Sequence, residues 1–190
     1  MLKKRTVIII VFLYSILSLS AQNSGNYPFK SGLINYALHG LTEGTERICF
    51  DDFGQHFSYL KVTTHSTSSG LPADSLLIII QHDSLFEYDL TKHKLLRQEE
   101  TGPNDQPRLN IITPEMINLL GYRLTGHEQI AGKTCDKFTG ENGNLWVWNR
   151  IVLKSEVEII DAHLITEATD IQVNTPVPDT YFKKPFNIIN

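Results

Sequence analysis

Residue types that perform acid–base or nucleophilic chemistry are present in this sequence, but their spacing does not assemble a catalytic motif. Asp51 and Asp52 are adjacent carboxylates, and adjacent strand residues point to opposite faces of a sheet, so the two cannot readily share a proton. We interpret the pair as a solvated hairpin corner. No Gly-x-Ser-x-Gly pattern occurs, and Cys135 follows a Gly-Lys turn instead of standing at a helix N-terminus. The sequence therefore predicts a protein that is not an enzyme.

Metal and cofactor signatures also do not occur at ligand spacing. The seven histidines form no His-x-His, His-x-x-x-His or Cys-His pair. Neither a Gly-x-Gly-x-x-Gly fingerprint nor a P-loop is present. We therefore predict no metal site and no cofactor.

Large apolar and aromatic side chains carry the remaining functional signal. Trp146 and Trp148 lie at positions i and i+2 of a predicted strand over 145–153, so they share a face, which Arg150 continues. The two indoles could line a ligand site, form a patch for a partner, or pack in the core. The candidates for lining a ligand cavity are Trp146, Trp148, Tyr36, Phe50, Phe57, Tyr59, Met116 and Leu120.

Cys49 and Cys135 are the two cysteines of the chain and are separated by 86 positions. A disulfide closing a loop of that length would stabilise the fold by roughly 4 kcal/mol if its geometry fitted. Two separate, half-buried thiols are the alternative, because free cysteines behave as small apolar groups. Spacing alone leaves both arrangements open.

The elements that must position these residues are mainly strands, because apolar residues recur with a period of two. One helix is expected after Thr113, with Thr113 as N-cap, Pro114 at the first position and Gly121 just past the end. Met116, Leu119 and Leu120 would form its sheet-facing side. About ten short strands with one short helix predict a mainly β fold: a strongly curved antiparallel sheet, or open half-barrel, whose concave side the helix covers.

The N-terminal residues have the pattern of a secretory signal peptide. Lys3, Lys4 and Arg5 precede an apolar run over 7–19, and small residues follow. That run is shorter than the ~17 to 25 residues of a membrane-spanning helix. We therefore expect a signal peptide over 1–21 and one exported domain over 22–190, with no transmembrane segment in the mature chain.

Charge limits the partners of that domain. Without residues 1–21 the chain has 14 basic and 21 acidic residues, a formal charge of about −7. The sequence has no basic stripe, which argues against nucleic acid and against an anionic membrane surface as partners.

Several motifs together resemble a family. They are the segments 31–36, 44–46 and 50–54 around an acidic turn, the Gly-Lys-x-Cys hairpin within 126–135, the Trp-x-Trp strand that opens 146–157, and the tail over 168–174, 177–179 and 182–185. The sequence resembles an uncharacterised group of secreted Gram-negative bacterial domains in the LolA/LolB-like superfamily of lipoprotein carriers. The resemblance implies an open half-barrel with an apolar cavity under a helix and loops, and a periplasmic or secreted location.

From these observations we expect a non-enzymatic periplasmic binding protein for a lipid, an acyl chain or another apolar small molecule. Its role would lie in envelope lipid or lipoprotein handling. The alternative is a structural or protein-interaction module of the cell envelope, whose cavity is filled by its own side chains and which docks an envelope protein.

Overall fold

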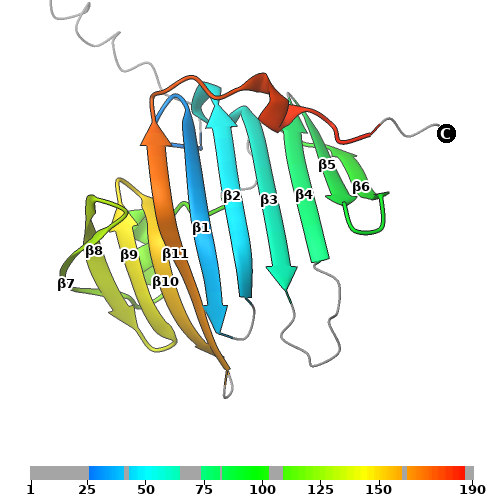
Figure 1. Ribbon diagram of the computed structural model, residues 1–190. Coiled ribbons are helices and arrows are strands. Elements are labelled where there is room, and N and C mark those ends of the chain that lie inside the picture. The colour runs from blue at the N-terminus through cyan, green and yellow to red at the C-terminus, as the bar shows by residue number, and fades with distance from the viewer. Residues whose placement is uncertain are drawn as a thin grey trace, which may run out of the picture.

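Alternating apolar residues form one antiparallel β-sheet of eleven strands in the computed structural model (Figure 1). The structure describes residues 26–40, 43–64, 74–81, 83–102, 109–159 and 162–186, so the predicted signal peptide lies outside the described residues. The strands are β1 (Gly32–Gly40), β2 (Glu43–Asp51), β3 (His56–Thr64), β4 (Asp74–Gln81), β5 (Ser84–Asp89), β6 (Lys94–Glu100), β7 (Arg123–Ile130), β8 (Lys133–Gly140), β9 (Gly143–Trp148), β10 (Ile151–Ile159) and β11 (Ala162–Val173). The helical turns are η1 (Asp52–Gly54), α2 (Pro114–Leu119) and η2 (Asp179–Phe182). The mainly β prediction with one short helix is confirmed.

The sheet consists of two meanders placed side by side. Its strand order is β6-β5-β4-β3-β2-β1-β11-β10-β9-β8-β7, so every neighbouring pair is consecutive in sequence except β1 and β11. The β1–β11 pair runs from Gly32 opposite Val173 to Gly40 opposite Leu164. This one pairing joins the first six strands to the last five.

The connection between β6 and β7 must link the two opposite edges of the sheet. Residues 101–122 make this link, and their described part includes α2. Ile111 forms a β-bridge to Ile151 at the start of β10, and the Leu109 carbonyl accepts a hydrogen bond from the Tyr27 hydroxyl at 2.9 Å. The connection therefore crosses one face of the sheet and covers part of it.

Strand register identifies that face. Leu38 lies opposite Thr166, Thr166 opposite Ser155, Ser155 opposite Leu145, and Leu145 opposite Phe138. Opposed residues share a face, so this row extends from β1 to β8 on one side of the sheet. We call this side, which also carries Tyr36, the α2 face.

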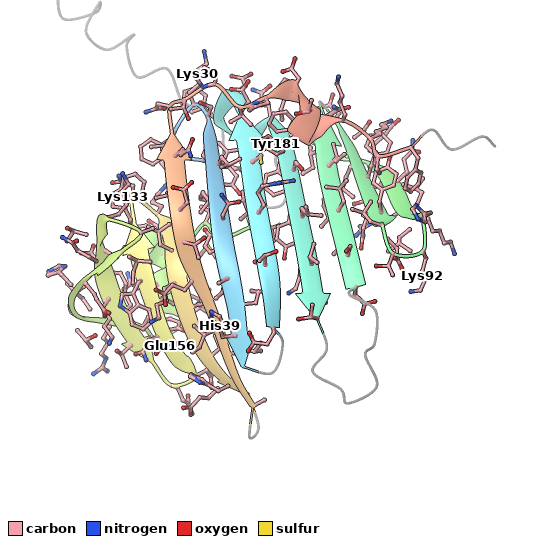
Figure 2. All side chains as sticks on the ribbon, in the orientation of Figure 1. Lys30, His39, Lys92, Lys133, Glu156 and Tyr181 are labelled. Carbon is pink, nitrogen blue, oxygen red and sulfur yellow. The ribbon has the colours of Figure 1, made fainter. Side chains whose placement is uncertain are left out.

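The other side is covered by the C-terminal segment, and we call it the C-terminal face. Tyr181 of η2 lies over β2 and β3, where the Arg47 guanidinium stands 4.4 Å from its ring centre (Figure 2). Gln81 donates a hydrogen bond to the Phe182 carbonyl, and Phe186 packs with Phe86 and Ile79. Residues 181–186 thus cover one end of this face.

Both faces of the sheet are buried at β4, and the sheet is less curved than the sequence predicts. Ile79 and Ile80 are neighbours in β4 that point to opposite faces, and both are fully buried in different apolar clusters. The sheet is not strongly curled. The physical reason is that chain segments cover both faces, so apolar surface is buried without wrapping the sheet around a hollow.

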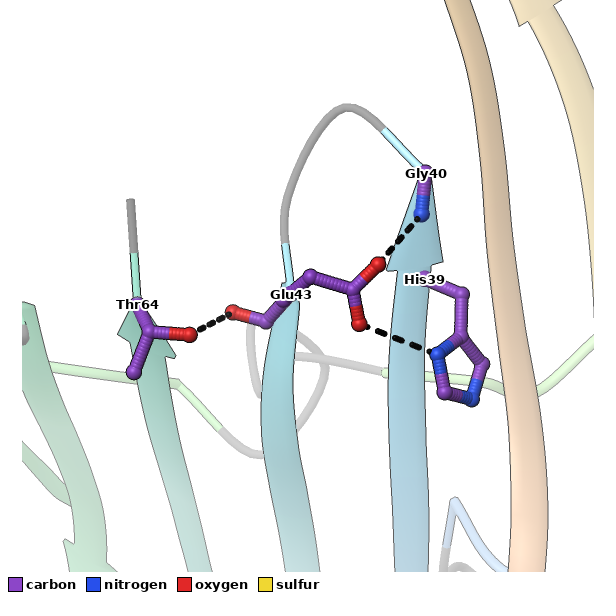
Figure 3. Close-up of polar contacts among 4 residues, drawn as sticks. All are labelled: His39, Gly40, Glu43 and Thr64. Atoms are coloured by element: carbon purple, nitrogen blue, oxygen red, sulfur yellow. Dashed lines mark hydrogen bonds and ion pairs between the residues drawn. The ribbon is translucent and has the colours of Figure 1, made fainter. Parts of the chain in front are cut away.

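The end of the β1–β2 hairpin is fixed by one carboxylate (Figure 3). Glu43 accepts a hydrogen bond from the Gly40 backbone N–H at 3.2 Å, and its other oxygen lies 3.0 Å from His39 Nδ1. Thr64 of β3 donates to the Glu43 carbonyl at 3.3 Å. The Gly40 hydrogen bond, followed by the contact with His39, lowers the pKa of the Glu43 carboxyl. These contacts tie the ends of three strands together.

Among the described residues, no helix combines the length and the apolar character that crossing a membrane requires.

Gly143, at the start of β9, has a backbone that other residues rarely adopt. Its φ is 138°, and a Cβ at this position would lie 1.8 Å from the Glu156 carbonyl oxygen. We predict that Gly143→Ala lowers the free energy of unfolding by about 2 kcal/mol or more, since a conformational cost adds to a backbone clash. Gly126→Ala is the control, because a Cβ there meets nothing within 4 Å. Urea denaturation of both variants measures the difference, and equal stabilities would contradict the assigned backbone.

Candidate functional site

A groove lies between α2 and the strands β8 and β9 on the α2 face. Its volume is about 370 Å³. Five of its lining residues are apolar, namely Ile112, Pro114, Ile117, Phe138 and Val147. The polar lining residues are Asn118, Asp136, Asn149 and Arg150. We call this feature the α2 groove.

Strand register accounts for the apolar floor of the groove. Phe138 lies opposite Leu145 on one side and opposite Leu124 on the other, so these three residues share the α2 face. Leu145 and Val147 are two positions apart in β9 and form a buried cluster with Ile112. The floor is thus built by three adjacent strands and continues to Leu124 at the edge of the sheet.

The orientation of α2 differs from the sequence-based expectation. Thr113 caps the helix as predicted, since its hydroxyl accepts a hydrogen bond from the Met116 backbone N–H at 3.3 Å. However, Ile117 is the helix residue that packs against the sheet cluster. The predicted sheet-facing residues Met116, Leu119 and Leu120 are all exposed, and Leu119 is 86% exposed. A helix of six residues rests on the sheet through one apolar side chain, so its longer apolar stripe faces outward.

One end of the groove is a tight turn. The predicted strand over 145–153 is wrong as one element, because β9 ends at Trp148 and β10 begins at Ile151. Asn149 and Arg150 form the turn with φ values of 46° and 69°. Two positive φ values suit a two-residue hairpin, whose twist matches that of the strands. Arg150 therefore does not continue the face of the two tryptophans, and instead lines the α2 groove.

Backbone and side-chain hydrogen bonds hold this turn in place. The Arg150 carbonyl accepts a hydrogen bond from the Ile112 N–H at 2.9 Å, and Val152 N–H donates to the Asn110 carbonyl at 2.8 Å. The Arg150 guanidinium donates through Nη2 to the Asn26 carbonyl at 3.4 Å. The backbone of the turn is thus joined to the segment that leads into α2, and the guanidinium is joined to the N-terminal segment at Asn26.

Asp136 is the acidic residue of the groove lining. Its carboxylate lies 2.9 Å from Nδ1 of His127, the residue opposite it on β7. Both side chains are more than half exposed. The pair is solvated at the edge of the groove and contributes little to stability.

The predicted cavity residues Tyr36, Phe50 and Phe57 are fully buried at the centre of the α2 face. The ring of Tyr27 stacks on Phe50 with 4.1 Å between centroids and also contacts Phe57. Burial raises the pKa of the Tyr27 and Tyr36 hydroxyls, which donate to the carbonyls of Leu109 and Val152. The N-terminal segment therefore fills this part of the face with its own aromatic side chain.

Tyr59 belongs to a polar group beside that aromatic cluster. Its hydroxyl donates to the buried carboxylate of Glu46 at 2.7 Å, and the Lys61 ammonium lies 3.1 Å from the same oxygen. Burial, and then the charge of Glu46, raise the pKa of Tyr59. The carboxylate has two partners, so this group is a satisfied ion pair within the fold.

Trp146 and Trp148 lie on the face opposite the groove. Trp146 is opposed by Lys137 and Lys154, whose ammonium groups stand 4.7 and 4.8 Å from its ring centre. Its indole N–H donates to Glu128 at 2.8 Å, and the side chain is 2% exposed. Trp148 stacks on Phe29. None of the eight predicted cavity residues lines the α2 groove.

Cys49 and Cys135 are free, buried thiols, which is the second of the two arrangements left open by the sequence. Cys49 lies in β2 and Cys135 in β8, five strand positions away. At about 4.8 Å per strand the separation is roughly 24 Å, far beyond the reach of a disulfide. Burial raises the pKa of the Cys49 thiol to about 11, with Arg47 acting in the opposite direction. Burial also raises the pKa of the Cys135 thiol.

Among the described residues, no group of three or more His, Cys, Asp or Glu side chains is arranged to hold a metal ion.

The sequence contained a signal for part of this site. Ile112, Thr113 and Pro114 mark the start of a capped helix, and the residues of β8 and β9 alternate as strands do. What the sequence did not indicate is that Phe138 and Val147, and not the tryptophans, share a face with α2. Only strand register and the Asn149–Arg150 turn decide this.

Comparisons with known proteins support the fold. No protein-family model matches the sequence, and no curated protein matches it. An uncharacterised conserved protein from Thermus thermophilus aligns over 91% of this chain and 94% of its own, with a TM-score of 0.51 and 10% identity. MucB aligns over 85% of this chain with a TM-score of 0.50 and 11% identity, and this chain covers 59% of MucB. The MucA/MucB complex of Pseudomonas aeruginosa aligns over 84% of this chain and 57% of its own, with 11% identity and a TM-score of 0.49.

These likenesses concern the fold. At 10–11% identity they show a shared fold with these proteins and no more.

We predict that both cysteines react without prior reduction once the chain is unfolded. Iodoacetamide in denaturant should add two alkyl groups per chain, whereas the folded protein at about pH 7.5 should remain unlabelled because both thiols are buried and protonated. Mass spectrometry of the intact chain measures the labelling. Labelling that requires a reducing agent would instead reveal a disulfide.

The outward leucines of α2 should contribute little to stability. We predict that Leu119→Ser changes the free energy of unfolding by less than about 0.5 kcal/mol, because the side chain is exposed. Ile112→Ala should lower it by about 2 to 4 kcal/mol, because Ile112 is 5% exposed within the cluster under α2. Thermal or urea unfolding compares the two variants. A large loss of stability in Leu119→Ser would show that the leucine is packed.

Proposed function

We propose that this chain is a non-enzymatic binding protein that takes a lipid, an acyl chain or another apolar molecule into the α2 groove. The groove itself is the observation that carries the proposal. Its lining is mainly apolar with a few polar groups, and its volume of about 370 Å³ falls within the ~300–1,000 Å³ of small-molecule sites.

The exposed apolar residues around the groove support a binding role. Met116, Leu119 and Leu120 lie on the outer side of α2, and Leu124 extends the groove floor to the sheet edge. Fully burying one leucine side chain is worth about 1.5–3 kcal/mol, so keeping several of them in water forgoes stability. Apolar groups gathered in this way are typical of a surface that is covered when a ligand or partner binds.

The chemistry of the described residues also favours binding over catalysis. The thiols are buried with raised pKa values, and the Glu46 carboxylate is occupied by Tyr59 and Lys61. A nucleophile needs a lowered pKa or a neighbouring base, and neither thiol has the former. The ionisable residues that line the α2 groove are Asp136, whose carboxylate contacts His127, and Arg150.

We further propose that the domain over 22–190 works in the periplasm, or after secretion, of a Gram-negative bacterium, after removal of a signal peptide over 1–21. The LolA-like fold supports a role in envelope lipid or lipoprotein handling, because that superfamily includes lipoprotein carriers.

A second function is favoured by one observation. The centre of the α2 face is filled by Tyr27, Tyr36, Phe50 and Phe57, as expected for an interaction module without a ligand cavity. In that case the exposed leucines of α2 would contact an envelope protein. The α2 groove, which those aromatic residues leave open, makes the binding of an apolar molecule the better-supported function.

A groove-filling variant tests the proposal. Asn118 is exposed and lines the groove, so Asn118→Trp should occupy it and weaken binding of the apolar probe 1-N-phenylnaphthylamine about tenfold or more. Asn142→Trp is the control, because Asn142 lies in the exposed turn between β8 and β9, outside the groove. Fluorescence titration measures both, and lipids extracted from the natively purified protein are identified by mass spectrometry. A wild-type protein that binds no probe and carries no lipid would refute the proposal.

A further inference from the structure

The α2 groove is polar at one end and apolar at the other. Asn149 and Arg150 line it at the β9–β10 turn. Moving back along β9, the lining becomes Val147, and across the strands the apolar floor continues through Phe138 to Leu124. At about 3.4 Å per residue, the part of β9 from Trp148 back to Leu145 is roughly 10 Å long. A groove with polar residues at one end and apolar residues along its floor suits a molecule that has a polar head and one apolar chain.

We propose that the α2 groove selects amphiphiles with an anionic headgroup, a carboxylate or a phosphate, which Arg150 binds while the chain lies along Val147 and Phe138. This inference rests on the proposed function of the groove and adds the chemical class of the ligand.

The position of Arg150 carries the inference. Its backbone is fixed by the hydrogen bond from Ile112 N–H to its carbonyl. Its guanidinium makes one long hydrogen bond, 3.4 Å, to the backbone carbonyl of Asn26, and no carboxylate of the described residues forms an ion pair with it. A guanidinium has five N–H donors in a planar fork that suits carboxylate and phosphate oxygens. The Arg150 side chain is exposed, so this fork is accessible to a ligand.

Asp136 is the lining residue whose carboxylate would repel a bound anion. Its carboxylate already pairs with His127 at 2.9 Å, across to β7 and away from the turn. Asp136 lies opposite Val147, whereas Arg150 lies three positions further along the chain. The negative charge is thus at the side of the groove, in contact with His127, and the positive charge is at its end. This arrangement favours an anionic head over a cationic one.

The test compares matched ligands on the full mature domain. Myristic acid, the neutral alcohol 1-tetradecanol and myristoyl lysophosphatidic acid share one chain length and differ in the head. Displacement of 1-N-phenylnaphthylamine gives their relative affinities. We expect the wild type to prefer the acid, the phosphate or both over the alcohol by about tenfold or more, because hydrogen bonds to charged groups are stronger than neutral ones. Which of the two anions is preferred identifies the headgroup.

Variants assign the preference to one side chain. Arg150→Gln should weaken binding of the anions about tenfold more than binding of the alcohol, while Arg150→Lys should keep part of the preference for anions. Arg123→Gln, an exposed arginine of β7 outside the groove lining, should keep it in full. Asp136→Asn should strengthen binding of the anions only. Circular dichroism confirms that each variant is folded.

Two results separate this inference from the function on which it rests. Equal affinity of the wild type for the acid, the phosphate and the alcohol, or equal weakening of all three by Arg150→Gln, overturns the selection of anions and leaves apolar binding intact. Failure of all three ligands to displace a bound probe, or of the probe to bind at all, overturns the proposed function itself.

Discussion

The pairing of β1 with β11 is the constraint on which the rest of the structure depends. It is the one strand contact between the two meanders, and it places β6 and β7 at opposite edges of an eleven-stranded sheet. Ten spacings of about 4.8 Å separate these edges by roughly 48 Å along the sheet. The connection from β6 to β7 must therefore cross a face, and this crossing brings Leu109, Ile111 and α2 over the sheet.

The crossing also explains why a groove remains. The α2 helix has six residues, so it is about 9 Å long and covers only part of β8 and β9. The centre of the same face is covered instead by Tyr27, whose ring stacks on Phe50. On the opposite face, residues 181–186 cover Ile79 and Phe86. A sheet covered on both sides has no need to close on itself, and the α2 groove lies beside a helix too short to cover the strands beneath it.

Much of this fold could be predicted from local sequence, because strand alternation and helix capping are local properties. The Thr113 cap and most strands follow from them. The turn at Asn149 and Arg150 could not, because positive φ in a two-residue hairpin usually calls for Asn-Gly, and arginine gives no such signal. The side of α2 that meets the sheet could not either, since Met116, Leu119 and Leu120 have the helical spacing of a buried stripe, and only tertiary contacts select Ile117.

The turn at Asn149 and Arg150, which the sequence did not predict, places polar residues at one end of the groove. Had β9 continued through Arg150, the guanidinium would lie on the face of Trp146, among Lys137 and Lys154. The turn instead moves it to the α2 face, next to the apolar cluster of Ile112 and Val147. An exposed cation at the edge of apolar surface attracts an anion, and an amphiphile supplies the anion together with an apolar chain that the proposed site would bury. The backbone geometry of two residues thus links the fold to the kind of molecule that we propose it binds.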